Sequence, residues 1–207
     1  MAPPRNTRRR AALADAAIEV LGTAGIHKLS HRAVDERASL PAGTAANYFP
    51  RRDDLLAAAA ERVAELHVAE MTAADRAAAD RAATGEDGGA AGGASAGLDT
   101  LARLIGASLY DAATRNRARY LAAYELALES TRLPALAGAM ARLGAGALEV
   151  TLAEHRALGL PTTPEQAQAL IALYNGTLLT LVVAPPEAVT PAGSLALARA
   201  LVAGALS

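Results

Sequence analysis

The chain has 207 residues, which is enough for one or two domains with a substantial core. It contains no cysteine, which excludes disulfides and thiolate zinc sites and fits a reducing compartment. Apolar residues make up 52% of the sequence, largely alanine and leucine, with one Phe and no Trp. Because alanine and leucine favour helices and alternating apolar runs are nearly absent, we predict an all-α fold.

The net charge of −1 hides an uneven distribution along the sequence. Residues 1–52 hold nine basic and four acidic side chains, a net charge of +5, so the remainder carries −6. A basic end joined to an acidic body suggests that one end meets a polyanion. A solvated charged face explains the same numbers, and charge alone does not decide between the two.

Residues 7–24 carry apolar side chains at helical spacing and predict the first helix. We expect Gly25 to end it as a left-handed C-cap, and Ser30 to be the N-cap of a short second helix over residues 30–38. Pro41 opens a third short helix that ends near residues 49–50.

A long fourth helix is predicted over residues 52–83, with two aspartates in its first turn, where acids complement the helix dipole. The next stretch, TGEDGGAAGGASAG at residues 84–97, holds six glycines and little to bury, which predicts a flexible loop. Further helices, about nine in all, are predicted over residues 98–114, 117–131, 134–158, 164–184 and 192–206. The predicted domains are residues 1–51 and 52–207.

The stretch LPAGTAANYF, residues 40–49, is unusually small and polar for a helix of so apolar a chain. Two short helices joined by a tight turn and supported by a third form a helix-turn-helix, whose second helix enters the major groove of DNA. Glycine and alanine allow close backbone approach, whereas threonine, asparagine and tyrosine offer polar groups to phosphates and bases. Arginines at the start of the next helix suit phosphate binding. The predicted DNA-contacting residues are Arg8, Arg9, Ser30, His31, Arg32, Ala42, Gly43, Thr44, Asn47, Tyr48, Arg51 and Arg52.

The arm PPRNTRRR, residues 3–10, adds four arginines at the N-terminal end. Such basic arms bind along the backbone or in the minor groove of DNA, which is why Arg8 and Arg9 are in the predicted set. A disordered solubilising tail is the alternative. For His31 the alternative is a surface role without DNA contact.

Residues 16–56, AAIEVLGTAGIHKLSHRAVDERASLPAGTAANYFPRRDDLL, resemble the DNA-binding domain of the tetracycline-repressor (TetR) family. That family has the pattern A-G-V-S-x-G-T-x-Y-x-H-F-x-x-K-x-x-L after its first two helices. The corresponding residues here are Ser39, Leu40, Pro41, Gly43, Thr44, Ala46, Tyr48, Phe49, Arg52 and Leu55.

Three positions depart from the family pattern. Pro41 replaces the usual serine, so a side-chain cap, which typically stabilises by about 1 kcal/mol, is missing there. Ala46 replaces the common tyrosine and removes one expected DNA contact, whereas Tyr48 replaces histidine and keeps a polar tip. These departures leave the fold prediction intact and put the operator sequence in doubt.

The resemblance implies that a ligand-binding and dimerising domain follows the DNA reader. In the family, the last two long helices of each subunit form a four-helix bundle across a two-fold axis. The sequence is compatible, because the apolar faces of these helices exceed what one small bundle hides, although an intramolecular core is the alternative. The predicted dimer residues are Leu170, Leu173, Thr177, Leu178, Leu181, Leu197 and Leu201.

A ligand pocket needs a few polar groups within an apolar bundle. Tyrosines and charged side chains in the second half of the chain meet that description, although an exposed ion-paired face and core tyrosines are the alternative. Because aromatic residues are few, an aliphatic or modestly polar metabolite is favoured over a flat cationic drug. The predicted ligand-binding residues are Arg103, Tyr110, Tyr120, Tyr124, Glu125 and Tyr174.

We therefore predict a homodimeric, ligand-responsive transcriptional repressor that binds double-stranded DNA at a palindromic operator and responds to an unknown small-molecule effector. The four histidines lack metal-ligand or triad spacing, so we expect no enzymatic activity, cofactor or metal. No signal sequence is visible, and amides interrupt the most apolar run, which predicts a cytoplasmic protein without a membrane span. The alternatives are an all-α protein-interaction module with a basic tip and a TetR-like regulator without a small-molecule inducer.

Overall fold

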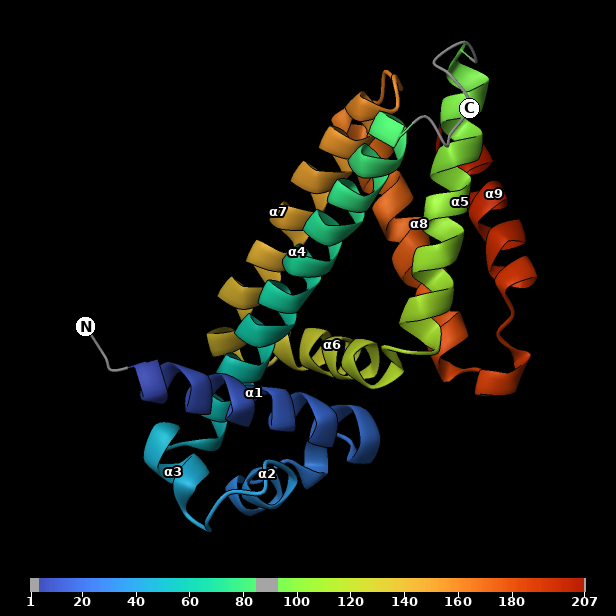
Figure 1. Cartoon of the computed structure of the whole chain (residues 1–207). Helices are drawn as coiled ribbons and strands as arrows, with labels where there is room; N and C mark the ends of the chain where they lie inside the picture. Colours follow the sequence, from blue (N-terminus) through green and yellow to red (C-terminus); the bar gives the residue numbers. More distant parts are fainter. Residues whose placement is uncertain (1–3, 85–92, 207) are drawn as a thin grey trace. The chain divides into compact units, whose positions relative to one another are not determined.

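The computed structural model describes residues 4–84 and 93–206, and the side chains of residues 7–70 and 95–206. Every regular element in this part of the chain is helical, which confirms the all-α prediction. The α-helices run in chain order as labelled in Figure 1. Their bounds are α1 Pro4–Ala24, α2 His31–Arg37, α3 Thr44–Tyr48, α4 Arg52–Thr84, α5 Gly93–Ala113, α6 Arg117–Ser130, α7 Pro134–Ala157, α8 Pro164–Val183 and α9 Pro191–Leu206, with short 3-10 helices at Ile26–Lys28 (η1) and Pro186–Ala188 (η2).

The chain divides into two compact units. The first, here called the head, comprises residues 1–67 and 117–143, and the second, the body, comprises residues 68–116 and 144–207. The head therefore contains α6 and the start of α7 as well as the first three helices. The proposed domain boundary at residue 51 remains a prediction.

The core of the head is built from α1, α2, α3, the first half of α4, α6 and the start of α7. Its largest fully buried side chain is that of Phe49, which follows α3. Around it pack leucines from four helices and small residues that allow close helix approach. The buried leucines of this core are Leu13, Leu21, Leu29, Leu55, Leu56, Leu126 and Leu136.

Local signals mark the helix ends at the start of the helix-turn-helix. Gly25 directly follows α1 as predicted and its positive φ of 85° favours glycine, but its ψ of 165° differs from the left-handed helical conformation that we expected of a C-cap. The hydroxyl of Ser30 accepts a hydrogen bond from the Ala33 amide at 3.2 Å and caps α2. Leu29 and Val34, on either side of the cap, are both buried, as a hydrophobic staple requires.

The predicted start of the third helix is wrong by three residues. Helix α3 begins at Thr44, because Pro41, Ala42 and Gly43 form a turn in which the Thr44 amide donates to the Pro41 carbonyl at 3.1 Å. Gly43 has φ of 89°, so it occupies left-handed backbone that glycine adopts without strain.

In the body, α5, α8 and α9 pack side by side (Figure 1). Helix α5 begins at Gly93, so residues 93–97 of the predicted loop are helical. A Cβ at Gly97 would lie 2.7 Å from the Leu158 carbonyl oxygen, so this glycine allows a close packing contact that local composition does not reveal. Thr84 of that predicted loop is the last residue of α4, and residues 85–92 lie outside the described residues.

Helix α8 begins with a complete capping box, in which Thr163 and Gln166 satisfy each other's backbone amides. By length and composition, α7 and α8 resemble membrane-crossing helices, with 17% and 22% of their most apolar windows buried. Core helices of soluble proteins meet the same test, so this result assigns no membrane span. The low burial does leave much of α8 uncovered within a single chain.

Candidate nucleic-acid interface

The N-terminus of α3 is capped by a side chain from α2. The Asp35 carboxylate accepts hydrogen bonds from the Gly43 amide at 2.8 Å and from the Ala45 amide at 2.7 Å. Asp35 is only 2% exposed, and its bond from Ala45 is buried while that from Gly43 is partly buried. Pro41 therefore leaves no missing cap, because Asp35 supplies the acceptor that a serine would have provided.

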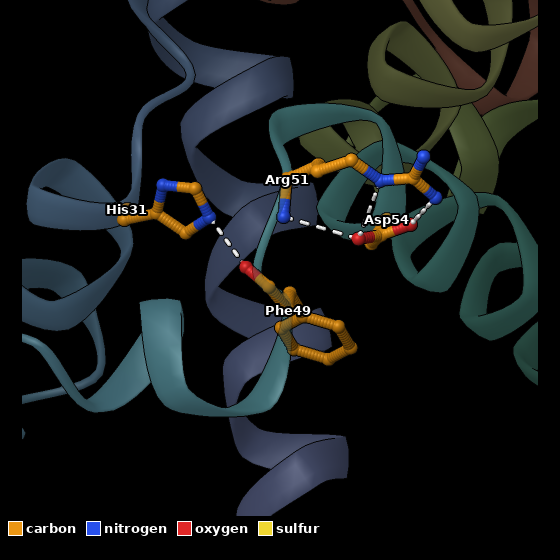
Figure 2. Close-up of polar contacts among 4 residues, drawn as sticks. All are labelled: His31, Phe49, Arg51 and Asp54. Carbon is orange, nitrogen blue, oxygen red and sulfur yellow. Dashed lines mark hydrogen bonds and ion pairs between the residues drawn. The ribbon is translucent and has the colours of Figure 1, made fainter.

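The C-terminal end of α3 is held by the same helix. The Nε2 of His31, in the first turn of α2, lies 2.6 Å from the Phe49 carbonyl oxygen, as Figure 2 shows. The His31 side chain is half-buried, and a ring N–H that donates to this carbonyl is directed at the protein. His31, which the sequence predicted to contact DNA, therefore has a partner within the protein.

The predicted groove-facing residues lie mostly in solvent. Ala42, Gly43 and Asn47 are exposed, and Thr44 and Tyr48 are half-buried. These five residues lie in α3 and in the turn directly before it, so they are neighbours in space as well as in sequence. We call them the α3 face.

Arg51 is engaged by an acidic neighbour at the start of α4. Its guanidinium donates to the Asp54 carboxylate at 2.8 and 3.2 Å, and its backbone amide donates to the same carboxylate at 3.0 Å (Figure 2). The side-chain hydrogen bond from Arg51, followed by that from its backbone amide, lowers the pKa of Asp54 below its ordinary value. The pair is ionised at neutral pH and lies at the protein surface, where a phosphate could compete for the arginine.

Arg52 contacts the turn that precedes α2. Its Nη2 donates to the Ile26 carbonyl at 2.6 Å and its Nε donates to the Leu29 carbonyl at 3.2 Å. The Arg52 residue is exposed overall, so this side chain fixes the η1 turn and still presents positive charge to solvent.

The remaining predicted contacts lie near the same end of the head. Arg8 and Arg9 are exposed on α1, and Arg10 places its guanidinium 4.5 Å from the centre of the Phe49 ring. Arg32 is exposed and pairs with Glu36 at 2.8 Å. Ser30 is committed to capping α2 through its hydroxyl.

Sequence reasoning missed Asp35. The signal was present, because an acid in the middle of a short helix with an apolar face is unusual, and because Pro41 removed the expected local cap. What the sequence did not show is that the Asp35 side chain reaches the amides of Gly43 and Ala45.

The predicted ligand-binding residues fall into both units. Arg103 and Tyr110 line a surface hollow of about 240 Å³ between α5 and α9 of the body. The Tyr174 hydroxyl lies 2.8 Å from that of Ser108, also in the body. Tyr120, Tyr124 and Glu125 lie on α6 of the head.

A second hollow of the body has a volume of about 470 Å³ and lies between α7 and α8. Its lining residues are uncharged and contain no aromatic ring. They are Gly144, Ala145, Leu148, Gln168, Ile171, Ala172 and Asn175. Within the described part of the chain, His, Asp and Glu residues form no cluster suited to a metal ion.

The predicted dimer residues differ in exposure. Leu173 and Leu197 are 44% and 41% exposed on α8 and α9, which pack against each other. Thr177 and Leu181 are half-buried. Leu170, Leu178 and Leu201 are buried in the subunit's own core, which is the alternative that the sequence left open for such positions.

Comparison with known proteins identifies the class to which this fold belongs. Residues 96–207 match the family model of the tetracyclin repressor-like C-terminal domain, which covers more than half of the chain. The chain therefore belongs to the TetR family and has the fold of a TetR-family transcriptional regulator.

Solved structures agree along almost the full length. A TetR-family member, SCO1917 from Streptomyces coelicolor A3, is 27% identical with a TM-score of 0.65, over 99% of each chain. The multidrug binding protein EbrR, complexed with ethidium, is 27% identical with a TM-score of 0.63, over 96% of this chain and 99% of its own. A TetR-family regulator from Mesorhizobium loti MAFF303099 shares the fold at 17% identity, with a TM-score of 0.69 over 99% and 98% of the two chains. A search of curated proteins finds no match.

Proposed function

We propose that this protein is a homodimeric transcriptional repressor that binds a palindromic DNA operator through the α3 face and releases it on binding a small-molecule effector. The single observation that carries DNA binding is the α3 face itself, a small and polar surface on a short helix held within a helix-turn-helix. Cytoplasmic location follows from the proposal, because the operator is chromosomal DNA.

Basic side chains around the α3 face supply the contacts to phosphates. Arg8 and Arg9 are exposed on α1, Arg32 on α2, and Arg51 and Arg52 at the start of α4. In this assignment Asn47 reads base edges, and Thr44 and Tyr48 bind phosphates or bases. Arg51 exchanges Asp54 for a phosphate when DNA is bound, since the closely spaced phosphates of a duplex together create a stronger negative potential than one carboxylate.

Dimerisation uses the exposed faces of α8 and α9. Leu173, Leu179 and Val183 on α8 are 44%, 42% and 62% exposed, and Leu197 on α9 is 41% exposed. These side chains lie on two helices that pack together, and such exposed apolar side chains suit contact with a second copy of the chain. Thr177 and Leu181 contribute to that surface, whereas Leu170, Leu178 and Leu201 support it from below.

The effector is proposed to bind in the body, at the hollow between α7 and α8. Its lining offers apolar side chains and the amides of Gln168 and Asn175, with no acidic group to pair with a cation. We therefore infer an uncharged, largely aliphatic effector with a few polar atoms. The likeness to EbrR, which is complexed with ethidium, favours a flat cation as the second candidate.

The deciding experiment measures binding of the full-length protein to duplex DNA. Selection from a random duplex pool should enrich a palindrome with two half-sites, and affinity should fall steeply as salt rises. Failure to bind any duplex at low salt would rule out the proposed function in favour of a protein-interaction module.

Variants sort the proposed contacts. Asn47→Ala should change the preference among bases, whereas Arg52→Ala should weaken binding to all duplexes and reduce the salt slope by about 1. Arg156→Ala, which removes an exposed arginine from the last turn of α7, is the matched control and should leave both measurements unchanged. Titration with ethidium and with neutral aliphatic compounds then tests the effector class.

A further inference from the structure

Two side chains of α2 hold opposite ends of α3. Asp35 accepts hydrogen bonds from the amides of Gly43 and Ala45 at the start of α3, at 2.8 and 2.7 Å. His31, four residues earlier and so one turn away on the same side of α2, lies 2.6 Å from the carbonyl of Phe49 at its end (Figure 2). We call His31 and Asp35 the α3 clamp.

Helix α3 needs such support because it has only five residues. A helix this short has no independent stability in water, and its terminal amides and carbonyls lack partners within the helix. The turn before it provides no side-chain cap, since Gly43 stands at the N-cap position. The direction of α3 is therefore set by whatever binds its two ends.

The Asp35 contact is a strong one. A buried carboxylate that accepts two backbone amides forms charge-assisted hydrogen bonds, and it lies at the positive end of the helix dipole. Both of its oxygens are used, one for each amide. Replacement by a neutral amide would keep one acceptor and direct an NH₂ group at the other backbone N–H.

The His31 contact fixes the other end through the backbone of a buried residue. Phe49 is 1% exposed and belongs to the core of the head. A bond to its carbonyl therefore ties the end of α3 to both α2 and that core. The Nε2 that makes this bond cannot at the same time donate to a DNA phosphate.

We propose that His31 and Asp35 are positioning residues for DNA recognition, which set the orientation of the α3 face without contacting DNA. This inference rests on the proposed DNA-binding function. It also removes His31 from the set of phosphate contacts. The rival explanation is that these bonds stabilise the head in general and have no particular effect on recognition.

The first test needs no DNA. In the full-length protein, Asp35→Asn should speed amide hydrogen exchange at Gly43 and Ala45 by about tenfold, while amides of α1 remain as protected as in the wild type. Glu36→Gln, which removes the neighbouring exposed carboxylate of α2, is the matched control and should leave exchange at both amides unchanged. Unchanged exchange in Asp35→Asn would overturn the Asp35 part of the clamp.

The second test measures recognition. The ratio of affinities for the selected palindrome and for a random duplex should fall about tenfold in His31→Leu and Asp35→Asn, with the salt slope unchanged because no phosphate contact is lost. His31→Gln, whose amide nitrogen can replace Nε2, should retain most of the wild-type ratio. His27→Gln, at an exposed histidine of η1, is the control for loss of an imidazole.

The outcomes separate the clamp from the proposed function. A salt slope reduced by about 1 in His31→Leu would make His31 a phosphate contact and overturn its positioning role. Equal losses for the palindrome and the random duplex would favour the rival explanation. If the wild type binds no duplex, the proposed DNA-binding function is wrong, but the exchange experiment still decides whether Asp35 holds α3. Should Asp35→Asn fail to fold, the pair of His31 variants still decides between positioning and contact.

Discussion

Gly22 on α1 lies directly against the backbone of Ala118 on α6. A Cβ at residue 22 would lie 2.7 Å from the Ala118 Cα and nearer still to its carbonyl oxygen. These are backbone atoms at the first turn of a helix, so they cannot rotate away as a flexible side chain would. We predict that Gly22→Ala lowers the free energy of unfolding by about 1–3 kcal/mol, the usual range for overpacking.

The control for that prediction uses another helical glycine. A Cβ at Gly204, on α9, would meet no atom within 4 Å. Gly204→Ala should therefore raise stability by about 0.4–1 kcal/mol, because alanine restricts the unfolded chain. Urea unfolding of both variants makes the comparison, and an unchanged Gly22→Ala variant would show that α1 and α6 are less tightly packed than described.

Ser39 is the only residue other than glycine with a positive φ among the described residues, at 53°. It follows α2 in a Schellman arrangement, in which the Leu40 amide donates to the Asp35 carbonyl at 2.9 Å and the Ser39 amide to the Glu36 carbonyl at 3.2 Å. Left-handed backbone disfavours a residue that has a Cβ. We expect Ser39→Gly to raise the thermal midpoint, with a gain in stability of about 0.5–1 kcal/mol. A lower midpoint would mean that the serine side chain offsets this strain.

Asp54 restrains an arginine of the proposed DNA surface. Its pKa is lowered chiefly by the side-chain hydrogen bond from Arg51, so the carboxylate stays charged well below neutral pH and competes with phosphate throughout the physiological range. Asp54→Asn should strengthen binding to random duplex DNA and steepen its salt dependence by up to about one unit of slope. Asp53→Asn, one residue earlier and exposed, is the matched control. A steeper slope in both variants would reflect net charge and not release of Arg51.

The exposed leucines of α8 and α9 make oligomeric state testable. Leu173→Arg and Leu197→Arg should shift the protein from dimer to monomer, because each would place a charge in an apolar contact. Leu128→Arg on α6 is the matched control, since Leu128 is 66% exposed and lies outside that surface. Sedimentation velocity at micromolar concentration measures the shift. A wild-type protein that sediments as a monomer would contradict the dimer.

Most of the helical pattern could be predicted from the sequence. Helix ends followed local signals such as Gly25 and Ser30, whose chemistry acts over a few residues. The predictions failed where contacts between residues far apart in the sequence are involved. Residues 93–97 are helical, and Gly97 lies close to the Leu158 carbonyl, a contact between distant parts of the sequence that composition alone does not reveal.

The candidate site divides in the same way. The residue types of the α3 face could be read directly, because a turn and a short helix place neighbours in sequence together in space. The roles of His31, Asp35 and Arg52 could not, because their partners lie up to 18, 10 and 26 residues away, respectively. Residue type therefore sufficed to propose a site, whereas the intramolecular partner of each side chain had to come from the structure.

His155 makes the stability of the body depend on pH. It is 1% exposed, its Nδ1 lies 2.7 Å from the Thr162 hydroxyl, and its Nε2 has no hydrogen-bond partner among the described residues. Burial lowers the pKa of His155 below its ordinary value of 6.5, because the charged imidazolium is poorly solvated there. Below about pH 6.5, His155 becomes protonated in the unfolded chain before it does so in the folded chain, because its pKa is lower in the folded chain.

Stability from this group should therefore be complete above about pH 6.5 and decrease as the pH falls toward and through the lowered pKa of the folded state. Urea unfolding at pH 7.5 and 5.5 measures the loss. His155→Asn keeps a polar group near Thr162 and does not titrate, so it should be less stable at pH 7.5 and lose less on acidification. His27→Gln should retain the wild-type pH dependence, because His27 is exposed. An equal loss in wild type and His155→Asn would assign the acid sensitivity to other groups, since burial of this imidazole would then carry none of it.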